Sequence, residues 1–295
     1  MSSIGYQRPV QKKQYQGQLT DVLQQDDEVG TVQKKTLDPL DAFILTGVLS
    51  AKECDQLVEN TEAMCYSFWN ASDPERKDFR NADTVEVQDA NLADRIWKRI
   101  KDLVVPEVCI TEDELRWERG LQGTWKAVGV NPILLFARYG PGGHFSPHTD
   151  GYTIIDLNNR SLYTLLLYLN TCESGGATRM FIPSSDDGER SYEQDKGGRM
   201  RWAEENVVGQ ADVKVGNALA FYQNIPHEGE PVGAGCAKYI IRTDIMYQVR
   251  GALAHSFTMF AHQLALDLYF VTWHICFDNY VYQGRFFFAQ ESKRT

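Results

Sequence analysis

The pattern of apolar and polar positions along the chain changes near residue 131. After this point come short runs rich in β-branched, aromatic and aliphatic residues, bounded by Gly, Pro, Asn and Asp. The runs are PILLFARY, SLYTLLLYLN, DVKVGNALAFY and KYIIRTDIMY. Since no helical pattern separates them, they predict an antiparallel sandwich or barrel rather than a doubly wound parallel sheet.

The chain before residue 131 predicts supporting helices over residues 50–104, after a strand within residues 40–49. Ser50-Ala51-Lys52-Glu53 reads as a capping box, which begins a helix that runs to about Met64. A second helix is predicted across NLADRIWKRIKDLV, because its apolar residues recur at helical spacing. These residues are Leu92, Ile96, Trp97, Ile100 and Leu103.

Three segments do not fit this core of helices and strands. Residues 1–36 are poor in large apolar side chains and predict a flexible N-terminal arm. The charged, Gly-rich region between Ile182 and Asn206 predicts a long mobile loop that could act as a lid. Residues 249–295 form an atypical apolar extension, which favours a packed helix or an unusual terminus over a membrane span because Asp267 and three histidines interrupt it. The domain itself is expected over residues 37–248, with its β-rich core at about 131–248.

Composition narrows the class of protein and its compartment. The 295 residues are 43% hydrophobic and 24% charged, as in an ordinary globular protein. The net charge of −10 argues against a nucleic-acid binder, whose surface would be basic. Six scattered cysteines without a C-x-x-C pair, and an N-terminus without an apolar signal region, predict reduced thiols and a cytoplasmic or nuclear protein.

A candidate metal site lies in YGPGGHFSPHTDG, directly before a β-rich run. His148 and Asp150 are alternate residues, and on an extended chain such residues face the same way, so they can bind one ion together. His227 follows the run ALAFY and could join them from a neighbouring strand. Two histidines and one carboxylate leave three coordination positions open, which is typical of non-haem Fe(II) oxygenases. The alternative is a hydrogen-bonded turn at His148 and Asp150 with His227 as an ordinary loop residue.

Two cations follow His227 on the last β-rich run. Lys238 and Arg242 share one face of that strand with Ile240, so both can point into the cavity that holds the metal. Buried cations need anionic partners, and a dicarboxylate bound to the metal at one end would offer its far carboxylate. An edge strand with solvated charges is the alternative.

Taken together, these motifs resemble the 2-oxoglutarate and Fe(II)-dependent dioxygenases, in particular their prolyl 4-hydroxylase-like branch. The resemblance covers about residues 40–248. It is carried by Y-x-x-G-x-x-F-x-x-H-x-D at 139–150, T-L-L-L-Y-L-N at 164–170, G-G-A-T-R-M-F at 175–181 and H-E-G-x-x-V at 227–232. It implies a mainly β fold, a double-stranded β-helix (a cupin-like jelly roll), with supporting α-helices.

The resemblance also implies roles for named residues. His148, Asp150 and His227 would bind Fe(II), and Lys238 would pair with the C5 carboxylate of 2-oxoglutarate. Tyr139 and Tyr168 match tyrosines that line this co-substrate pocket. Because GAGCAK makes the spacing from His227 one residue longer than in prolyl hydroxylases, Arg242 is the alternative partner of that carboxylate.

The implied reaction is hydroxylation of an unactivated C–H bond with dioxygen, releasing succinate and carbon dioxide, and the resemblance extends to ascorbate binding. The substrate stays open among peptides, proteins and small molecules, with prolyl hydroxylation of a peptide as the default, and so does the oligomeric state. Arg80, Asn81 and Arg138 resemble pocket-lining positions of uncharacterised relatives, although surface charges would look the same. A metal-dependent hydrolase with the same ligands and a catalytically silent jelly-roll binding module are the competing functions.

Overall fold

The computed structural model describes residues 14–16, 19, 22, 30–70, 72–112, 121–182, 192–194 and 200–249. These residues belong to one compact unit that ends at Arg250. Within them, no helix is both long and apolar enough to cross a membrane. The apolar extension expected at 249–295 lies outside the described residues, apart from Val249 at the end of the last strand.

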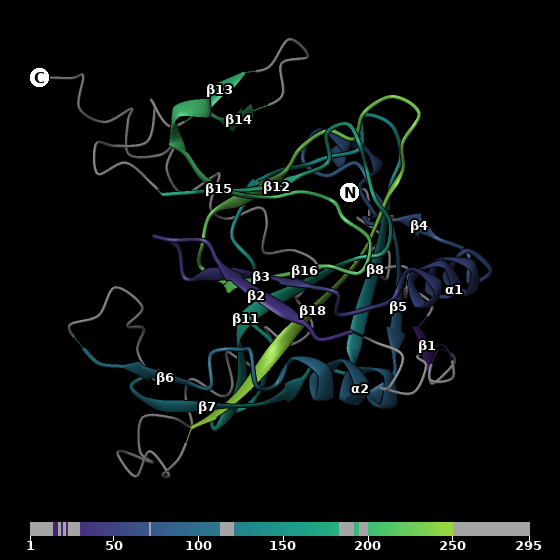
Figure 1. Ribbon diagram of the computed structural model, residues 1–295. Helices are drawn as coiled ribbons and strands as arrows, with labels where there is room; N and C mark the ends of the chain where they lie inside the picture. Colours follow the sequence, from purple (N-terminus) through teal and green to yellow (C-terminus); the bar gives the residue numbers. More distant parts are fainter. Residues whose placement is uncertain are drawn as a thin grey trace, which may run out of the picture. The chain divides into compact units, whose positions relative to one another are not determined.

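β-strands are the predominant secondary structure of the described chain (Figure 1). The first half contains β1 (Gln14–Gln16), β2 (Gln33–Thr36), β3 (Ala42–Thr46), α1 (Ala51–Glu62), β4 (Ser67–Phe68), the 3₁₀ helix η3 (Pro74–Asp78), β5 (Asp83–Gln88), α2 (Ala90–Ile100), β6 (Glu107–Ile110) and β7 (Gly123–Val130). The second half contains β8 (Ile133–Tyr139), β9 (Phe145–His148), β10 (Ile154–Asp156), β11 (Asn159–Tyr168), β12 (Thr178–Phe181), β13 (Tyr192–Gln194), β14 (Met200–Trp202), η4 (Glu204–Asn206), β15 (Val207–Ala211), β16 (Ala218–Tyr222), β17 (His227–Gly229) and β18 (Lys238–Val249).

The core strands from β8 onward are divided between two sheets, with β8, β11, β16 and β18 in the larger and β9, β12, β15 and β17 in the smaller. The larger sheet runs in the order β1-β5-β8-β18-β11-β16-β3-β2, and the smaller in the order β15-β12-β17-β9. Figure 1 shows β12 and β15 in one layer and β3, β16 and β11 in another. Except between β12 and β15, the chain changes sheet from each of these core strands to the next, which makes the core a double-stranded β-helix, or jelly roll, as expected.

Side chains from the facing sheets meet in the interior. The Phe221 ring on β16 lies 4.5 Å from the His227 ring on β17, centroid to centroid. The Tyr168 hydroxyl on β11 donates to Thr178 Oγ1 on β12 at 2.9 Å. Nearly every residue of β11 is buried, because this strand pairs on both edges, with β16 and β18, and lies at the centre of the larger sheet. A strand buried in this way needs a continuous apolar run, and SLYTLLLYLN supplies one.

Both predicted helices form, and each begins directly after a capping residue. Ser50 and Glu53 close the capping box of α1, with Ser50 Oγ accepting from Glu53 N and Glu53 Oε2 accepting from Ser50 N. The same Glu53 carboxylate is fully buried and forms a salt bridge with Arg99 at 2.8 Å. Arg99 belongs to α2, so this ion pair ties the two helices together. Asp89 caps α2 by accepting from the amides of Asn91 and Leu92.

Two segments that the sequence predicts to be irregular, the N-terminal arm and the 182–206 loop, contain strands. Gln33–Thr36, within the expected N-terminal arm, form β2 and pair with β3, because an exposed polar strand can still extend a sheet through its backbone. Gln14–Gln16 likewise form β1 and pair in parallel with β5. In the expected 182–206 loop, β13 pairs with β14. The rest of both segments lies largely outside the described residues, so a mobile arm and a lid stay predictions, as do the domain limits.

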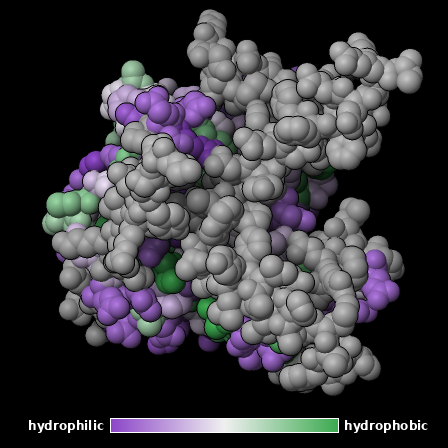
Figure 2. All heavy atoms as spheres, turned by 180° about the vertical axis from the view of Figure 1, so that it is seen from behind, coloured by the Kyte–Doolittle hydropathy of each residue, from purple (hydrophilic) through white to green (hydrophobic). Residues whose placement is uncertain are grey.

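The surface of the described part is mainly polar. On the face in Figure 2, the described residues are mostly hydrophilic, with small apolar groups between them. Exposed apolar side chains occur on β10 and in the turn that follows it, where Ile154, Ile155 and Leu157 are 60–65% exposed. This turn follows closely on the HTDG segment.

The buried Glu53–Arg99 pair predicts a large effect of one substitution on stability. Glu53→Gln should lower the free energy of unfolding by about 3–5 kcal/mol, because it leaves a buried guanidinium without its counter-charge. Ser50→Ala, which removes only the cap, is the control and should lower it by about 1 kcal/mol. Chemical denaturation measures both, and similar losses for the two variants would contradict a structural role for the ion pair.

Candidate functional site

Two short strands of the smaller sheet bring the HTDG segment and the NIPHEG segment together. His148 ends β9, His227 begins β17, and the two residues are direct antiparallel partners. Their ring centroids lie 4.2 Å apart. Asp150 lies just beyond β9, where its backbone amide donates to the carbonyl of Gln223 at 3.0 Å. The segment after His148 is thus fixed to the chain just before His227.

The three side chains converge on one point. One potential ligand atom from each of His148, Asp150 and His227 lies within 4.8 Å of the others. His148 Nε2 is 3.8 Å from Asp150 Oδ1, and His227 Nε2 is 3.8 Å from Asp150 Oδ2. Among the described residues, this is the only group of His, Cys, Asp or Glu that could hold a metal ion in this way.

Hydrogen bonds at the other ring nitrogens orient both imidazoles. His148 Nδ1 lies 2.8 Å from the carbonyl of Ser146, and His227 Nδ1 lies 2.9 Å from the carbonyl of Ile225. A carbonyl oxygen only accepts, so each Nδ1 carries the proton and each Nε2 presents a lone pair to the centre. Histidine ligands of metals are usually held by such a bond.

The protonation states also suit metal binding. Burial, followed by the charge of His227, lowers the pKa of His148 to about 3, so its imidazole is neutral at physiological pH. Burial would raise the pKa of Asp150, but Arg242 and the two histidines outweigh it and hold this pKa below its ordinary value. The site therefore offers a neutral His148 imidazole and the Asp150 carboxylate, and with His227 these form the two-histidine, one-carboxylate set used for non-haem Fe(II).

The structure adds one supporting residue that the sequence did not single out. Thr164, on β11, donates from Oγ1 to Asp150 Oδ2 at 2.6 Å. Thr164 is fully buried in the larger sheet, so it fixes the carboxylate from the opposite layer. Its position in T-L-L-L-Y-L-N was visible, but nothing in that apolar run distinguished a threonine that reaches the site.

Phe145 and His144 lie on the approach to the triad and differ in their contacts. The Phe145 ring stacks on the His148 ring, with centroids 3.6 Å apart and planes at 20°. The His144 ring instead lies within 3.1 Å of the carbonyl of Gly142 and within 3.0 Å of that of Asp78. Phe145 is therefore a wall of the site, whereas His144 stabilises the loop around it.

A second cluster surrounds Lys238. This side chain is 4% exposed, and its Nζ donates to the carbonyl of Gly176 at 2.6 Å. The same Nζ lies 5.5 Å from the centroid of the Tyr139 ring and 5.7 Å from that of Tyr168. No carboxylate of the described residues forms an ion pair with Lys238. Burial lowers its pKa to about 8, against the opposing charges of Cys172 and Glu230 and with a further lowering by Arg80.

Arg242 lies apart from this cluster. Its Nη2 is 3.2 Å from Asp244 Oδ1 and 4.0 Å from Asp150 Oδ1, and it donates to the carbonyl of Gly151 at 3.2 Å. Four residues of strand separate Lys238 from Arg242 by about 13 Å, so the two cations serve different ends of the site. The structure thus brings together three of the four residues expected around the co-substrate, with Arg242 beside the carboxylate of Asp150 instead.

The three remaining candidates from the sequence, Arg80, Asn81 and Arg138, differ in their contacts. Arg138 forms salt bridges with Glu62 at 2.9 Å and with Asp83 at 2.8 Å, which gives it a structural role. Arg80 is buried beside Phe145, with its guanidinium carbon 4.7 Å from the ring centroid. The contact that involves Asn81 comes from its backbone amide, which donates to the carbonyl of His144.

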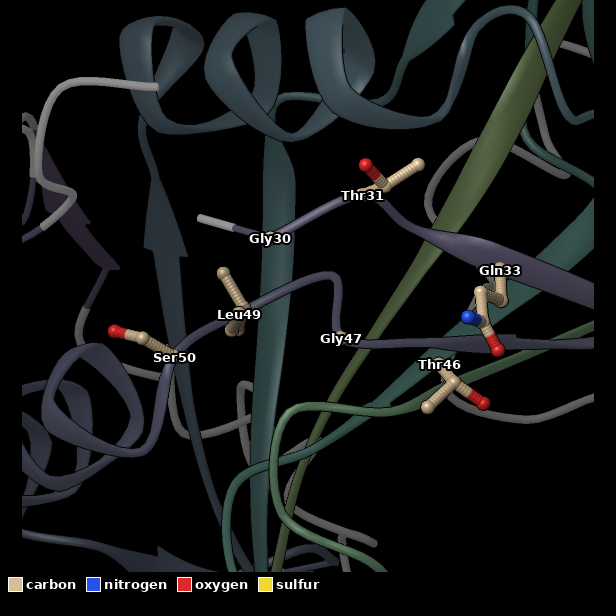
Figure 3. A pocket seen from close by; sticks show the side chains of 7 residues that line it. All are labelled: Gly30, Thr31, Gln33, Thr46, Gly47, Leu49 and Ser50. Carbon is tan, nitrogen blue, oxygen red and sulfur yellow. The ribbon is translucent and has the colours of Figure 1, made fainter. Parts of the chain in front are cut away.

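A pocket elsewhere in the described chain does not compete with this site. It lies between the segments that flank β2, β3 and the start of α1 (Figure 3). Its lining residues are Gly30, Thr31, Gln33, Thr46, Gly47, Leu49 and Ser50. None of them is a metal ligand or carries a charge, so the pocket lacks the groups that chemistry requires.

Comparison with known proteins agrees with the geometry. Residues 134–243 match the family described as the 2OG-Fe(II) oxygenase superfamily. No curated protein matches the chain.

Several solved structures resemble the chain at low identity. A prolyl-4-hydroxylase from Pseudomonas putida is 19% identical, with a TM-score of 0.42, covering 73% of this chain and 96% of its own. The viral collagen prolyl hydroxylase from Paramecium Bursaria Chlorella virus-1 is also 19% identical, with a TM-score of 0.42, and covers 73% of this chain and 100% of its own. A prolyl hydroxylase from Trichoplax adhaerens, in complex with a hypoxia inducible factor peptide fragment, is 16% identical, with a TM-score of 0.44, and covers 72% and 85%.

The matched residues 134–243 contain β8 through most of β18, and with them all three residues of the convergent triad and Lys238. The double-stranded β-helix is the fold that the sequence resemblance implied. Residues 134–243 therefore match the 2OG-Fe(II) oxygenase superfamily, and this match supports an oxygenase enzyme.

Proposed function

We propose that this oxygenase hydroxylates an unactivated C–H bond, with Fe(II) held by His148, Asp150 and His227 and with 2-oxoglutarate held by Lys238. The observation that carries the proposal is the buried Lys238, which forms no ion pair with a described carboxylate and lies near the rings of Tyr139 and Tyr168. A buried ammonium group is unfavourable unless an anion joins it. The far carboxylate of 2-oxoglutarate supplies that anion.

The residues of the triad fit a metal ion on chemical grounds. Two imidazole Nε2 lone pairs and one carboxylate approach a common point, and both Nδ1 protons are engaged by backbone carbonyls. The carboxylate is held in turn by Thr164. Such outer hydrogen bonds orient ligands before the metal binds.

Each protein group has a distinct part in the reaction. His148, Asp150 and His227 would hold the metal through two imidazoles and one carboxylate. Lys238 anchors the far end of the co-substrate, while Tyr139 and Tyr168 line the pocket around it and exclude water. When bound, Fe(II) and 2-oxoglutarate supply the activation of dioxygen and the oxidation of the C–H bond, with succinate and carbon dioxide as products.

Neither of the two competing functions requires a buried cation at Lys238. A metal-dependent hydrolase would use the triad to activate water and needs no buried cation beyond it. A silent binding module has no reason to keep three converging ligands together with their hydrogen bonds. Ascorbate binding, a cytoplasmic or nuclear location, and a peptide, protein or small-molecule substrate are further parts of the proposal, which rest on the sequence alone.

Turnover of 2-oxoglutarate tests the proposal directly. Purified protein loaded with Fe(II) should release succinate from 2-oxoglutarate in the presence of oxygen. His148→Ala should lower this release by more than about 100-fold, since even outer partners of metal ligands are worth 10–100-fold. His144→Ala is the matched control in the same motif and should retain the release. Equal succinate release by wild type and His148→Ala would overturn the assignment.

The hydrogen bond from Thr164 predicts an effect on metal affinity. Thr164→Val keeps the shape of the side chain and removes the donor to Asp150, so metal binding should weaken by about 10–100-fold. Titration with Co(II), followed by its visible absorption, measures the change. Thr178→Val, which affects the Tyr168 hydroxyl instead, is the control. An unchanged affinity in Thr164→Val would show that Asp150 needs no such support.

The lowered pKa of Lys238 predicts how co-substrate binding depends on pH. The pKa is about 8 in the folded protein and 10.5 without burial. Because the carboxylate requires the charged lysine, 2-oxoglutarate affinity should fall above pH 8, by up to about tenfold per pH unit. Lys238→Arg keeps its charge in this range, so its affinity should not show this decline. A wild-type affinity that is constant from pH 7 to pH 10, as measured by calorimetry, would contradict the role of Lys238.

The lowered pKa of Lys238 also predicts how stability depends on pH, and this dependence is opposite to that of co-substrate affinity. Between pH 8 and 10.5 the unfolded chain holds the Lys238 proton more tightly than the folded chain does. The unfolding free energy from this residue therefore rises with pH across that window, without co-substrate. The two trends together separate a lysine that awaits an anion from one that is permanently paired.

A further inference from the structure

Arg80 lies at the open edge of the smaller sheet, directly beside β9. It forms an isolated antiparallel bridge with Phe145, and the flanking backbone bonds run from Asn81 N to His144 O and from Ser146 N to Phe79 O. The segment around Arg80 is therefore registered against the strand that carries His148. Its position depends on the backbone, so the side chain is free to serve another purpose.

The Arg80 side chain is largely buried, and one of its donors has no hydrogen-bond partner. The residue is 9% exposed, and its Nε has no hydrogen-bond partner. Within the described part of the chain, no carboxylate forms a salt bridge with it. Its neighbours are aromatic rings: its guanidinium carbon lies 4.7 Å from the centroid of Phe145 and 5.8 Å from those of Tyr139 and Trp69. Ring faces attract the charge, but they do not satisfy the N–H donors in the guanidinium plane.

These rings place Arg80 between the two parts of the proposed site. Phe145 stacks on His148, and Tyr139 is the same ring that Lys238 contacts at 5.5 Å. The charge of Arg80 also contributes to the lowered pKa of Lys238, so the two cations are close enough to repel each other.

The proposed contents of the site leave the charge of Arg80 unbalanced. Fe(II) and Lys238 together contribute three positive charges, and Asp150 with the two carboxylates of 2-oxoglutarate contribute three negative charges. Arg242 is balanced by Asp244. One buried guanidinium thus remains, and a buried cation calls for an anion.

We propose that Arg80 binds a carboxylate of the substrate to be hydroxylated, so that this enzyme acts on carboxylate-bearing molecules. The proposal rests on the proposed function for the identity of the reaction, but not for the anion site itself. A carboxylate is planar and matches two N–H donors of a guanidinium, and the surrounding rings suit the apolar part of such a substrate. Arg80 fixes the end of the substrate, beside the histidine that faces the metal.

Anion binding to Arg80 is measured with acetate as the probe. The protein is loaded with Zn(II) and 2-oxoglutarate, which fill the triad and the Lys238 pocket, and the Nε–Hε resonance of Arg80 is followed by NMR. Acetate should shift this resonance saturably, whereas acetamide, its neutral analogue, should not. Arg80→Met should lower acetate affinity about tenfold or more, as expected for a lost charge-assisted pair. A resonance that ignores acetate, or equal affinities for acetate and acetamide, overturns the proposal.

Variants distinguish the carboxylate of a substrate from that of the co-substrate. Arg80→Met should weaken acetate binding more than 2-oxoglutarate binding, and Lys238→Met should do the reverse. Arg138→Met is the control, because that guanidinium already has two carboxylate partners, and it should leave acetate affinity unchanged. If Arg80→Met weakens 2-oxoglutarate binding as much as Lys238→Met does, Arg80 belongs to the co-substrate and the proposal is wrong.

Stability separates a binding role from a structural one. Removal of a buried unpaired charge should leave the thermal midpoint of Arg80→Met at or above that of wild type. A clear drop in the midpoint would show that Arg80 maintains the fold instead. If the protein bound neither Zn(II) nor 2-oxoglutarate, the proposed function would fail, yet the acetate titration of the metal-free protein would still decide the role of Arg80.

Discussion

The antiparallel pairing of β9 with β17 is the constraint on which the candidate site depends. It sets His148 directly opposite His227, and each ring is turned by a bond to the carbonyl two residues before it. Side chains of a strand alternate between its faces, so a slip of one residue would turn His227 away from the interior. The register is held on the other edge of β17, where His227 is the partner of Met180 on β12. The smaller sheet thus positions two ligands, and the larger sheet contributes Thr164 to hold the third.

Unbalanced burial of charge is the second organising feature. The interior contains cations that are neutralised by protein carboxylates, such as Arg99 by Glu53 and Arg179 by Glu228. Lys238 and Arg80 differ from these, since no described carboxylate pairs with either. Burying a cation in this way destabilises the free protein, and an anionic ligand would offset this cost. The two cations therefore indicate which kind of ligand the site is built to receive.

The sequence predicted much of the core because its signals were local. The capping box at Ser50 and Glu53, the helix over NLADRIWKRIKDLV and the four β-rich runs each depend on neighbouring residues, and all of these elements formed. The side-chain pattern did not predict β2, whose side chains are exposed and polar, because that strand is held by backbone bonds to β3. Such pairing leaves no trace in the pattern of side chains.

The candidate site shows the same limit of local sequence patterns, at the level of single side chains. Alternation correctly placed His148 with Asp150, and it placed Lys238 and Arg242 on one face of β18. Alternation could not show that the two cations reach different parts of the site. Lys238 lies near the tyrosine rings, whereas Arg242 lies beside Asp150 and Asp244. Nor could alternation show that Arg138 has two carboxylates for partners while Arg80, with the same side chain, has none. Charge in a sequence is a property of single residues, whereas the need for a ligand is a property of what the fold packs around them.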